Sequence, residues 1–174
     1  MLAAGQTTPA SYFVDAAERE KKGGQAFYSC LEYDSEIYFG SDNGRVWCYQ
    51  KENGQFQLQN LPASSRIVSI NSVEGNELIF TTAKDGFFSY QPKTKAIEHF
   101  PASRFPNAST HSVYVDKASE VWFEQHIPGT VVHFNPRTRI LKHEKVPVEP
   151  TSTDRSRPAF HIHEDINGVL WVHP

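Results

Sequence analysis

The sequence predicts an all-β fold of the β-propeller type, with about four blades of four antiparallel strands. The first observation is a repeated phrase, an acidic turn followed by a short apolar strand, which is most complete at residues 165–172. The second is its spacing, since the steps between copies are 41, 43 and 49 residues when Tyr38, Ile79, Trp122 and Trp171 are aligned. The third is the sequence between the copies, where short apolar segments alternate with glycine turns. A period of about 40–50 residues built from short strands is typical of propeller blades.

Composition sets further limits on the function. With 174 residues, 39% of them hydrophobic, the chain is long enough for one domain with a single core. The net charge of −3, without a basic stripe, argues against a nucleic-acid partner, because binding phosphates requires a basic surface. No apolar run approaches the roughly 20 residues of a membrane-spanning helix, so no membrane segment is expected. The N-terminus lacks the pattern of a signal peptide, so any export signal is expected to lie outside this chain.

Three whole blades are expected at about residues 26–60, 66–101 and 110–145. A partial blade is expected at each end, over residues 1–25 and 159–174. In each whole blade a glycine turn separates the second strand from the third, and the Asn-Gly and Asp-Gly pairs in two of these turns are strong hairpin signals.

The end of each predicted third strand has a common form. An apolar residue is followed by Asp, Gln or Asn and then by a polar turn, at Asp15, Gln50, Gln91 and Asn135. Proline or Asn-Gly in three of these turns favours a reversal of the chain, and a fourth strand follows each of them. The segment after Asp15, residues 15–22, is either a fourth strand or a short helical turn ended by a glycine pair.

Two arrangements remain open for the ends. The chain is expected to begin at the third strand of one blade and to end in the second strand of another. If the two ends meet, they complete one blade, and the result is a small four-bladed ring. If they do not meet, the chain is a slice of a larger propeller, and a second copy or a neighbouring propeller is needed to cover its exposed edges.

The two cysteines, Cys30 and Cys48, fall on the predicted first and third strands of one blade. Strands separated by one neighbour lie about 10 Å apart, which is too far for a disulfide. Two buried free thiols are therefore expected.

The phrase at residues 165–172, Asp-Ile-Asn-Gly-Val-Leu-Trp-Val, resembles the two-component regulator propeller repeat. The resemblance extends over about four repeats and nearly all of the chain. Departures include Ser119 in the place of Gly168, and Tyr38 and Ile79 in place of tryptophan. The resemblance implies a propeller in the periplasmic sensor region of a hybrid histidine kinase from polysaccharide-degrading bacteria.

This resemblance implies a region that senses oligosaccharides, is not catalytic in itself, needs no cofactor and transmits binding by shifting the packing of propellers. The parent protein would be a sensor histidine kinase. One alternative is a self-contained propeller module that binds another protein. Another is a propeller glycoside hydrolase or lyase, although no catalytic motif is visible in the sequence.

Candidate ligand-binding residues lie in the turns between second and third strands, around Asn43, Lys84 and His126. These turns vary in sequence while the strands around them repeat. Trp47 is added because it lies off the repeat register and an aromatic face suits a sugar ring. By contrast, Trp122 and Trp171 hold the repeat position, where packing between blades is expected.

Histidines and paired carboxylates offer other chemistry. His161 and His163 share one face of a strand and would need His126 or His173 to complete a zinc site. We expect them to be polar surface histidines and predict no metal site. The acidic pairs Glu18/Glu20 and Glu164/Asp165 are expected to serve turns, because a glycosidase needs two carboxyl groups about 5 Å apart in a pocket.

Overall fold

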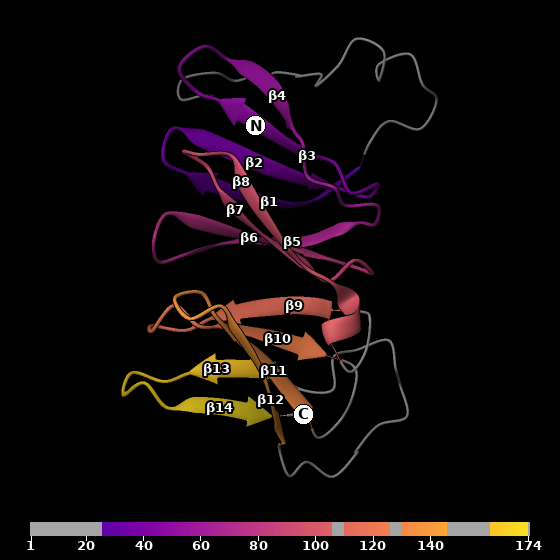
Figure 1. Cartoon of the computed structure of the whole chain (residues 1–174). Coiled ribbons are helices and arrows are strands. Elements are labelled where there is room, and N and C mark those ends of the chain that lie inside the picture. Colours follow the sequence, from indigo (N-terminus) through magenta and orange to yellow (C-terminus); the bar gives the residue numbers. More distant parts are fainter. Residues whose placement is uncertain (1–25, 106–109, 126–129, 146–160, 174) are drawn as a thin grey trace.

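The computed structural model describes residues 26–105, 110–125, 130–145 and 161–173. These residues form three four-stranded antiparallel sheets and one two-stranded hairpin (Figure 1). Within each sheet the strands follow one another in chain order. The predicted all-β fold of four-stranded blades is confirmed.

The strands are short, as the turn spacing predicts. The first sheet contains β1 (Phe27–Tyr33), β2 (Glu36–Ser41), β3 (Val46–Gln50) and β4 (Gln55–Gln59). The second contains β5 (Ile67–Val73), β6 (Glu77–Thr82), β7 (Phe87–Gln91) and β8 (Ala96–Phe100), and the short 3-10 helix η1 (Ala102–Arg104) follows it. The third contains β9 (Thr110–Val115), β10 (Val121–Gln125), β11 (Thr130–Asn135) and β12 (Ile140–Lys145). The hairpin pairs β13 (His161–Glu164) with β14 (Leu170–His173). The expected partial blade at residues 1–25, including the undecided segment 15–22, lies outside the described residues.

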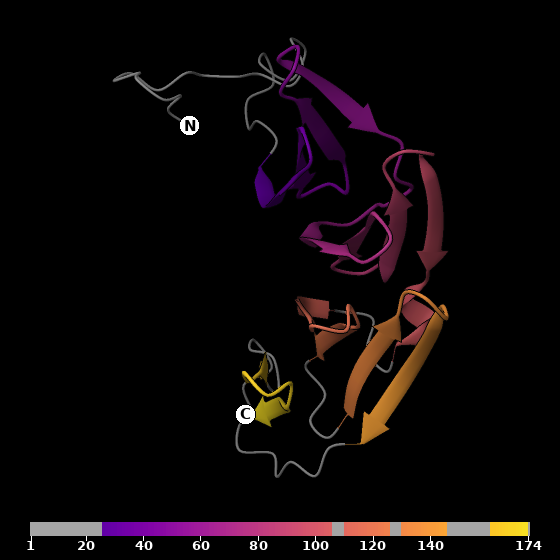
Figure 2. The ribbon, with the colours of Figure 1, turned by 90° about the vertical axis from the view of Figure 1, so that its left-hand side faces the viewer.

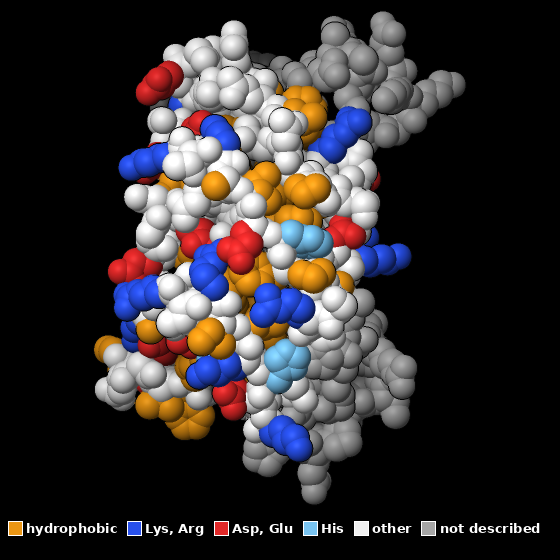
Figure 3. Space-filling view, in the orientation of Figure 1, with side chains coloured by type: hydrophobic (Ala, Val, Ile, Leu, Met, Phe, Trp, Pro, Cys, Tyr) orange, Lys and Arg blue, Asp and Glu red, His pale blue; other side chains and the backbone are white. Residues whose placement is uncertain are grey.

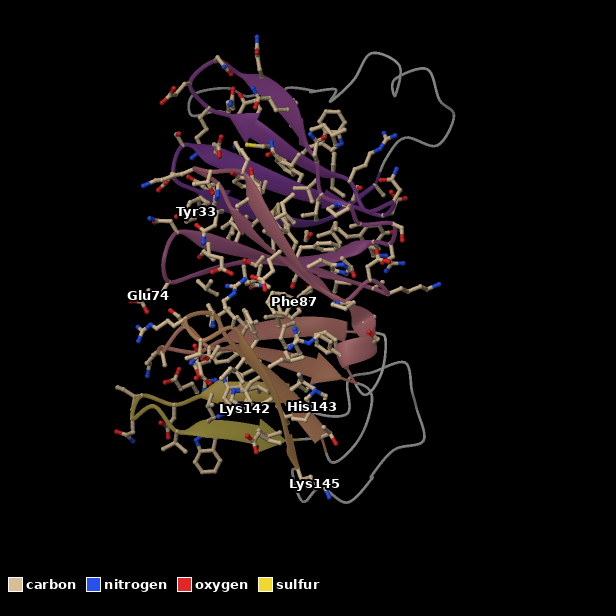
Figure 4. The ribbon with its side chains drawn as sticks, viewed as in Figure 1. Tyr33, Glu74, Phe87, Lys142, His143 and Lys145 are labelled. Atoms are coloured by element: carbon tan, nitrogen blue, oxygen red, sulfur yellow. The ribbon has the colours of Figure 1, made fainter. Side chains whose placement is uncertain are left out.

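The sheets follow one another along an open arc, as Figure 2 shows. The first strands of the sheets are neighbours, with β1 against β5 and β5 against β9. The fourth strands form the outer side of the arc. On β12 this side carries Lys142, His143 and Lys145, which point away from the core in Figure 4. Charged side chains of this kind protect an outer strand from pairing with another chain.

The turns between third and fourth strands are equivalent in the three whole sheets. In each, the residue four positions after the end of the third strand donates its N–H to that strand's last carbonyl: Gly54 to Gln50, Lys95 to Gln91 and Arg139 to Asn135, at 2.9, 2.8 and 2.9 Å. All three donors have positive φ, at 69°, 60° and 61°. This common geometry aligns the three sheets residue by residue.

Aromatic side chains fill the spaces between the sheets. Between the first and second sheets, Tyr38 packs edge-on against Phe80 and Tyr90. Between the second and third, Phe87 stacks on Phe100 with 4.4 Å between ring centroids and contacts Phe123 at 5.0 Å (Figure 4). Each such side chain contributes about 1.5–3 kcal/mol by its burial.

The register predicted from the repeat is confirmed in the three whole sheets, and Trp171 has the same place in the last hairpin. Tyr38 pairs across its sheet with Cys48, Ile79 with Ser89 and Trp122 with His133, and these partners occupy equivalent positions. Tyr38 and Ile79 are fully buried, each facing the next sheet. The half-buried Trp122 packs on the third interface, its ring stacked on His133 at 4.4 Å.

Trp171 differs from the other three residues of the repeat position in its exposure to solvent. The sequence predicts that it packs between blades, but 56% of it is exposed. Its strand, β14, belongs to the last described sheet, so no described sheet covers the face on which it lies.

The prediction for the cysteines is half right. Both are free thiols on the first and third strands, and Cys48 is buried. Cys30, however, is exposed. It pairs with Phe39 on the outward face of the first sheet, where no described sheet packs against it.

Candidate functional site

The turns that carry Asn43 and Lys84 lie at the edge of the sheets that also carries η1, on the right in Figure 1. Both side chains are exposed. Each turn is tied to the residues just before a first strand, because the N–H of Asp42 donates to the carbonyl of Ala26 at 3.1 Å and that of Ala83 to Arg66 at 2.9 Å. Asn43 and Lys84 thus occupy corresponding places on neighbouring blades.

Glycine is required in these turns for both conformation and space. Gly86 has a φ of 88°, and a Cβ atom there would lie 2.1 Å from the carbonyl oxygen of Phe100. Gly44 has a φ of 82°, with the carbonyl oxygen of Ala63 at 2.6 Å from such a Cβ. Since only glycine tolerates both conditions, the turns pack closely against the connections between blades.

Asp85 fixes the connection between the first and second sheets. Its carboxylate accepts hydrogen bonds from the backbone N–H groups of Ser64 and Ser65, both at 2.8 Å, and from their two hydroxyl groups, both at 2.9 Å. Burial alone would raise the pKa of Asp85, but these four hydrogen bonds lower it below its ordinary value. The carboxylate is therefore held ionised as a structural anchor.

An aromatic side chain between the two turns was not predicted from the sequence. Tyr28, at the start of β1, is 55% exposed, and the guanidinium carbon of Arg66 lies 4.5 Å above its ring centre. The carbonyl of Arg66 is bonded to the turn that carries Lys84, and Tyr28 lies two residues after Ala26, which is bonded to the turn that carries Asn43. The contact between Tyr28 and Arg66 therefore joins the turns of neighbouring blades. We call Tyr28, Asn43, Arg66 and Lys84 the turn face. The signal for Tyr28 in the sequence was an aromatic residue at the start of a first strand, which resembles an ordinary core position.

The turn face combines groups that suit a polar ligand. The exposed ring of Tyr28 offers an apolar surface, and Arg66 and Lys84 offer positive charge. Asn43 adds a polar amide, whose oxygen already accepts the hydroxyl of Ser41 at 2.7 Å within the turn. Chemically, the arrangement can stack on a flat apolar group, bond to hydroxyl groups and attract an anionic substituent.

Other predicted site residues lie elsewhere. Trp47 lies on β3 and is only 7% exposed, so its expected surface role is wrong and it belongs to the core. His126 lies outside the described residues. His161 and His163 share an exposed face of β13, on either side of the buried Ile162.

Of the two acidic residues in the last hairpin, Asp165 serves the turn, as expected, and Glu164 does not. Oδ1 of Asp165 accepts the N–H groups of Asn167 and Val169 at 2.8 and 3.0 Å. Glu164 accepts the backbone N–H of Lys117 at 2.8 Å, linking the hairpin to the third sheet. In the described part of the chain, no group of three or more His, Cys, Asp or Glu side chains is placed to hold a metal ion.

A buried charge network lies at the opposite edge of the sheets, between the second and third. Glu77 is 4% exposed and accepts hydrogen bonds from Arg139 at 2.7 Å and from the hydroxyl of Ser89. Arg139 also donates through Nε to Glu98 at 3.0 Å. Figure 3 shows Lys and Arg interspersed with Asp and Glu over this side of the molecule. Since each buried charge has a partner, the network holds two blades together.

The corresponding place between the first and second sheets holds Glu36, Tyr38 and Cys48. The hydroxyl of Tyr38 donates to Glu36 at 2.5 Å. Burial, and next the charge of Glu36, raise the pKa of the Cys48 thiol to about 12. Burial likewise raises the pKa of Tyr38, and the hydrogen bond to Glu36 adds to this effect. The Cys48 thiol and the Tyr38 hydroxyl therefore stay protonated at neutral pH and are unsuited to act as nucleophiles.

Comparison with solved structures identifies the class of fold. The chain superposes on the extracellular domain of a proposed one component system from B. thetaiotaomicron, with a TM-score of 0.66 and 16% identity over 88% of this chain and 20% of that one. A second match is the extracellular domain of a proposed hybrid two component system from the same organism, with a TM-score of 0.66 and 17% identity over 92% of this chain and 23% of that one. A third is virginiamycin B lyase from Staphylococcus aureus, with a TM-score of 0.67 and 18% identity over 87% of this chain and 50% of that one.

At these identities the likeness shows the fold, which is that of β-propellers. The chain spans between one fifth and one half of the length of these three proteins. No protein-family model matches the sequence, and comparison with curated proteins found no match. In the described residues, no helix is long and apolar enough to cross a membrane.

Proposed function

We propose that this chain is part of the ligand-sensing propeller of a bacterial two-component regulator, that it detects oligosaccharides in the periplasm, and that it is not catalytic itself. The repeat at residues 165–172 and the likeness in fold to extracellular domains of regulatory systems support this assignment.

The turn face is the observation on which the proposal depends. The exposed ring of Tyr28 contacts Arg66, and the turns bonded to the residues before β1 and β5 carry Asn43 and Lys84; such a set can stack on a pyranose and bond to its hydroxyl groups. Arg66 and Lys84 favour oligosaccharides that carry carboxylate or sulfate groups. Loops held on a rigid scaffold are the usual place for recognition in such folds.

The absence of catalysis in this chain is part of the proposal. The carboxylate of Asp85 lies at this edge of the sheets. It is held ionised, and both of its oxygens accept hydrogen bonds from Ser64 and Ser65. A general acid for glycoside cleavage would instead need a raised pKa.

The test is to incubate the purified protein with a panel of neutral and uronic acid-containing oligosaccharides. Binding is measured by titration calorimetry, and the recovered sugar by mass spectrometry. The proposal predicts binding, strongest for an acidic oligosaccharide, with recovery of the intact ligand. Cleavage of the sugar would overturn the non-catalytic assignment, and lack of binding to every member would overturn the choice of ligand.

A further inference from the structure

The ring of Tyr28, on which a bound sugar is expected to stack, is already in contact with a cation. The guanidinium carbon of Arg66 lies 4.5 Å from the ring centre, inside the limit of about 6 Å for a cation–π contact. One face of an aromatic ring holds one partner at stacking distance. A sugar that stacks on this face of Tyr28 must therefore displace Arg66.

Arg66 belongs to the same bonded unit of the turn face as Lys84. The N–H of Ala83 donates to the carbonyl of Arg66 at 2.9 Å, and the N–H of Lys84 donates to the hydroxyl of Ser65 at 3.0 Å. The two cations are thus carried by backbone segments that are bonded to each other. A ligand that contacts both Lys84 and the ring of Tyr28 therefore also meets Arg66.

Neither cation of the turn face is neutralised by a described carboxylate. At the opposite edge of the sheets, Arg137 and Arg139 each pair with a glutamate of the neighbouring sheet. In the part of the chain that the structure describes, no Asp or Glu forms an ion pair with Arg66 or Lys84. The nearest carboxylate in the sequence, that of Asp85, accepts four hydrogen bonds from two serines instead. The charges of Arg66 and Lys84 therefore remain available to an anionic ligand.

We infer that Arg66 selects the ligand of the turn face, because it competes with neutral oligosaccharides for the ring of Tyr28 and binds those that carry a carboxylate. This inference rests on the function proposed above. A carboxylate draws the guanidinium away from the ring by accepting two parallel, charge-assisted hydrogen bonds, and the sugar then stacks on the ring. A neutral sugar cannot accept such bonds, so it displaces the cation without compensation.

The two effects of Arg66 have opposite signs and can be separated. Loss of an exposed cation–π contact corresponds to about a two- to fivefold change in affinity, so covering the ring weakens a neutral ligand by this factor. The charge-assisted bonds to a carboxylate strengthen an acidic ligand by about tenfold or more. Removing Arg66 should therefore strengthen one ligand and weaken the other, whereas a residue that acts by its charge alone strengthens neither when it is removed.

The test compares a neutral oligosaccharide with a uronic acid-containing one of the same length. Titration calorimetry measures both affinities for the wild type and for Arg66→Ala. The variant should bind the neutral ligand about two- to fivefold more tightly, because the ring of Tyr28 is uncovered. It should bind the acidic ligand about fivefold or more weakly, because the carboxylate loses its bidentate partner. The preference for the acidic ligand should therefore fall by about tenfold or more.

Two further variants separate the covering of the ring from the effect of charge. Lys84→Ala removes the same charge from the same face, and it should weaken the acidic ligand without strengthening the neutral one, because the described cation over the ring is Arg66. Arg66→Lys keeps the charge but lacks the planar, bidentate guanidinium, so its affinity for each ligand should lie between those of the wild type and Arg66→Ala. Circular dichroism confirms that each variant is folded.

The possible results distinguish this inference from the proposed function. If Arg66→Ala weakens both ligands, or leaves the affinity for the neutral ligand unchanged, Arg66 does not compete for the ring, and the inference is overturned while oligosaccharide binding stands. If neither oligosaccharide binds to any of the proteins, the proposed function fails and the inference fails with it. A stronger neutral ligand together with a weaker acidic one supports both.

Discussion

Nε1 of Trp122 donates a hydrogen bond to Oδ2 of Asp116 at 2.7 Å, and Trp171 makes the same bond to Asp165 at 3.1 Å. In both turns the other carboxylate oxygen accepts two backbone N–H groups, two and four residues further on. One aspartate thus shapes the turn and positions the tryptophan of the following strand, which explains why the repeated phrase combines these two residues.

Replacing Asp116 with alanine should therefore destabilise the protein by about 2–3 kcal/mol, because three donors lose their acceptor in a partly buried turn. Urea unfolding measures this change. Asp165→Ala is the matched control, with a smaller effect because its turn is exposed at the end of the arc. Equal losses in the two variants would contradict the importance of burial here.

Replacing Arg139 should strongly destabilise the folded protein. Arg139→Ala leaves Glu77 buried without its cation, so the free energy of unfolding should fall by about 2–4 kcal/mol. Arg137→Ala is the control, because Arg137 pairs with Glu74 at the surface, where both side chains are more than half exposed. That change should cost less than about 1 kcal/mol. Thermal or urea unfolding measures both changes. If Arg139→Ala and Arg137→Ala lower the unfolding free energy by similar amounts, the Glu77 network does not hold the blades together.

The two thiols should differ in reactivity. Cys30 is exposed, whereas Cys48 is buried with its pKa raised to about 12, so Cys48 has almost no thiolate at pH 8. A thiol reagent at pH 8 should modify one cysteine in the folded protein and two in denaturant, and peptide mass spectrometry should locate the first at Cys30. Rapid labelling of Cys48 in the folded state would contradict the packing between the first two sheets.

Asp85 should make stability depend on pH in the acid range. Its pKa is lower in the folded protein than its ordinary value of 3.8, so its stabilising effect is present above that value and is lost as the pH falls through the lowered one. Asp85→Asn removes the charge. The difference in unfolding free energy between wild type and this variant should be largest at neutral pH and should shrink toward pH 3. A difference that does not change with pH would show that the charge is not what Ser64 and Ser65 stabilise.

Local regularities made much of the fold predictable from sequence. The strand-turn pattern and the step from Tyr38 to Ile79 to Trp122 depend on residues close together in the chain or repeated in it. The glycine turns at Gly44 and Gly86 were identifiable for the same reason, since only glycine meets the steric conditions there.

Contacts between blades were harder to predict. The pairing of Glu77 with Arg139 joins residues 62 positions apart. The steps of 41 and 43 residues between Glu36, Glu77 and Glu120, which match the repeat, were nevertheless a signal in the sequence. The exposure of Trp171 and Cys30 depends on which sheet lies beside them, and no local pattern contains that information. Trp47 is buried, but aromatic residues occur both in cores and on surfaces. Its residue type alone therefore could not predict its place.

The most direct test of the sensing account is the affinity of an acidic oligosaccharide for three proteins: wild type, Tyr28→Ala and Lys142→Ala. Calorimetry should show binding to wild type and Lys142→Ala with the same affinity. Binding to Tyr28→Ala should be about tenfold weaker or more, because the stacking surface on the turn face is removed. Equal affinity for all three proteins would place the ligand elsewhere and contradict the assignment of the turn face.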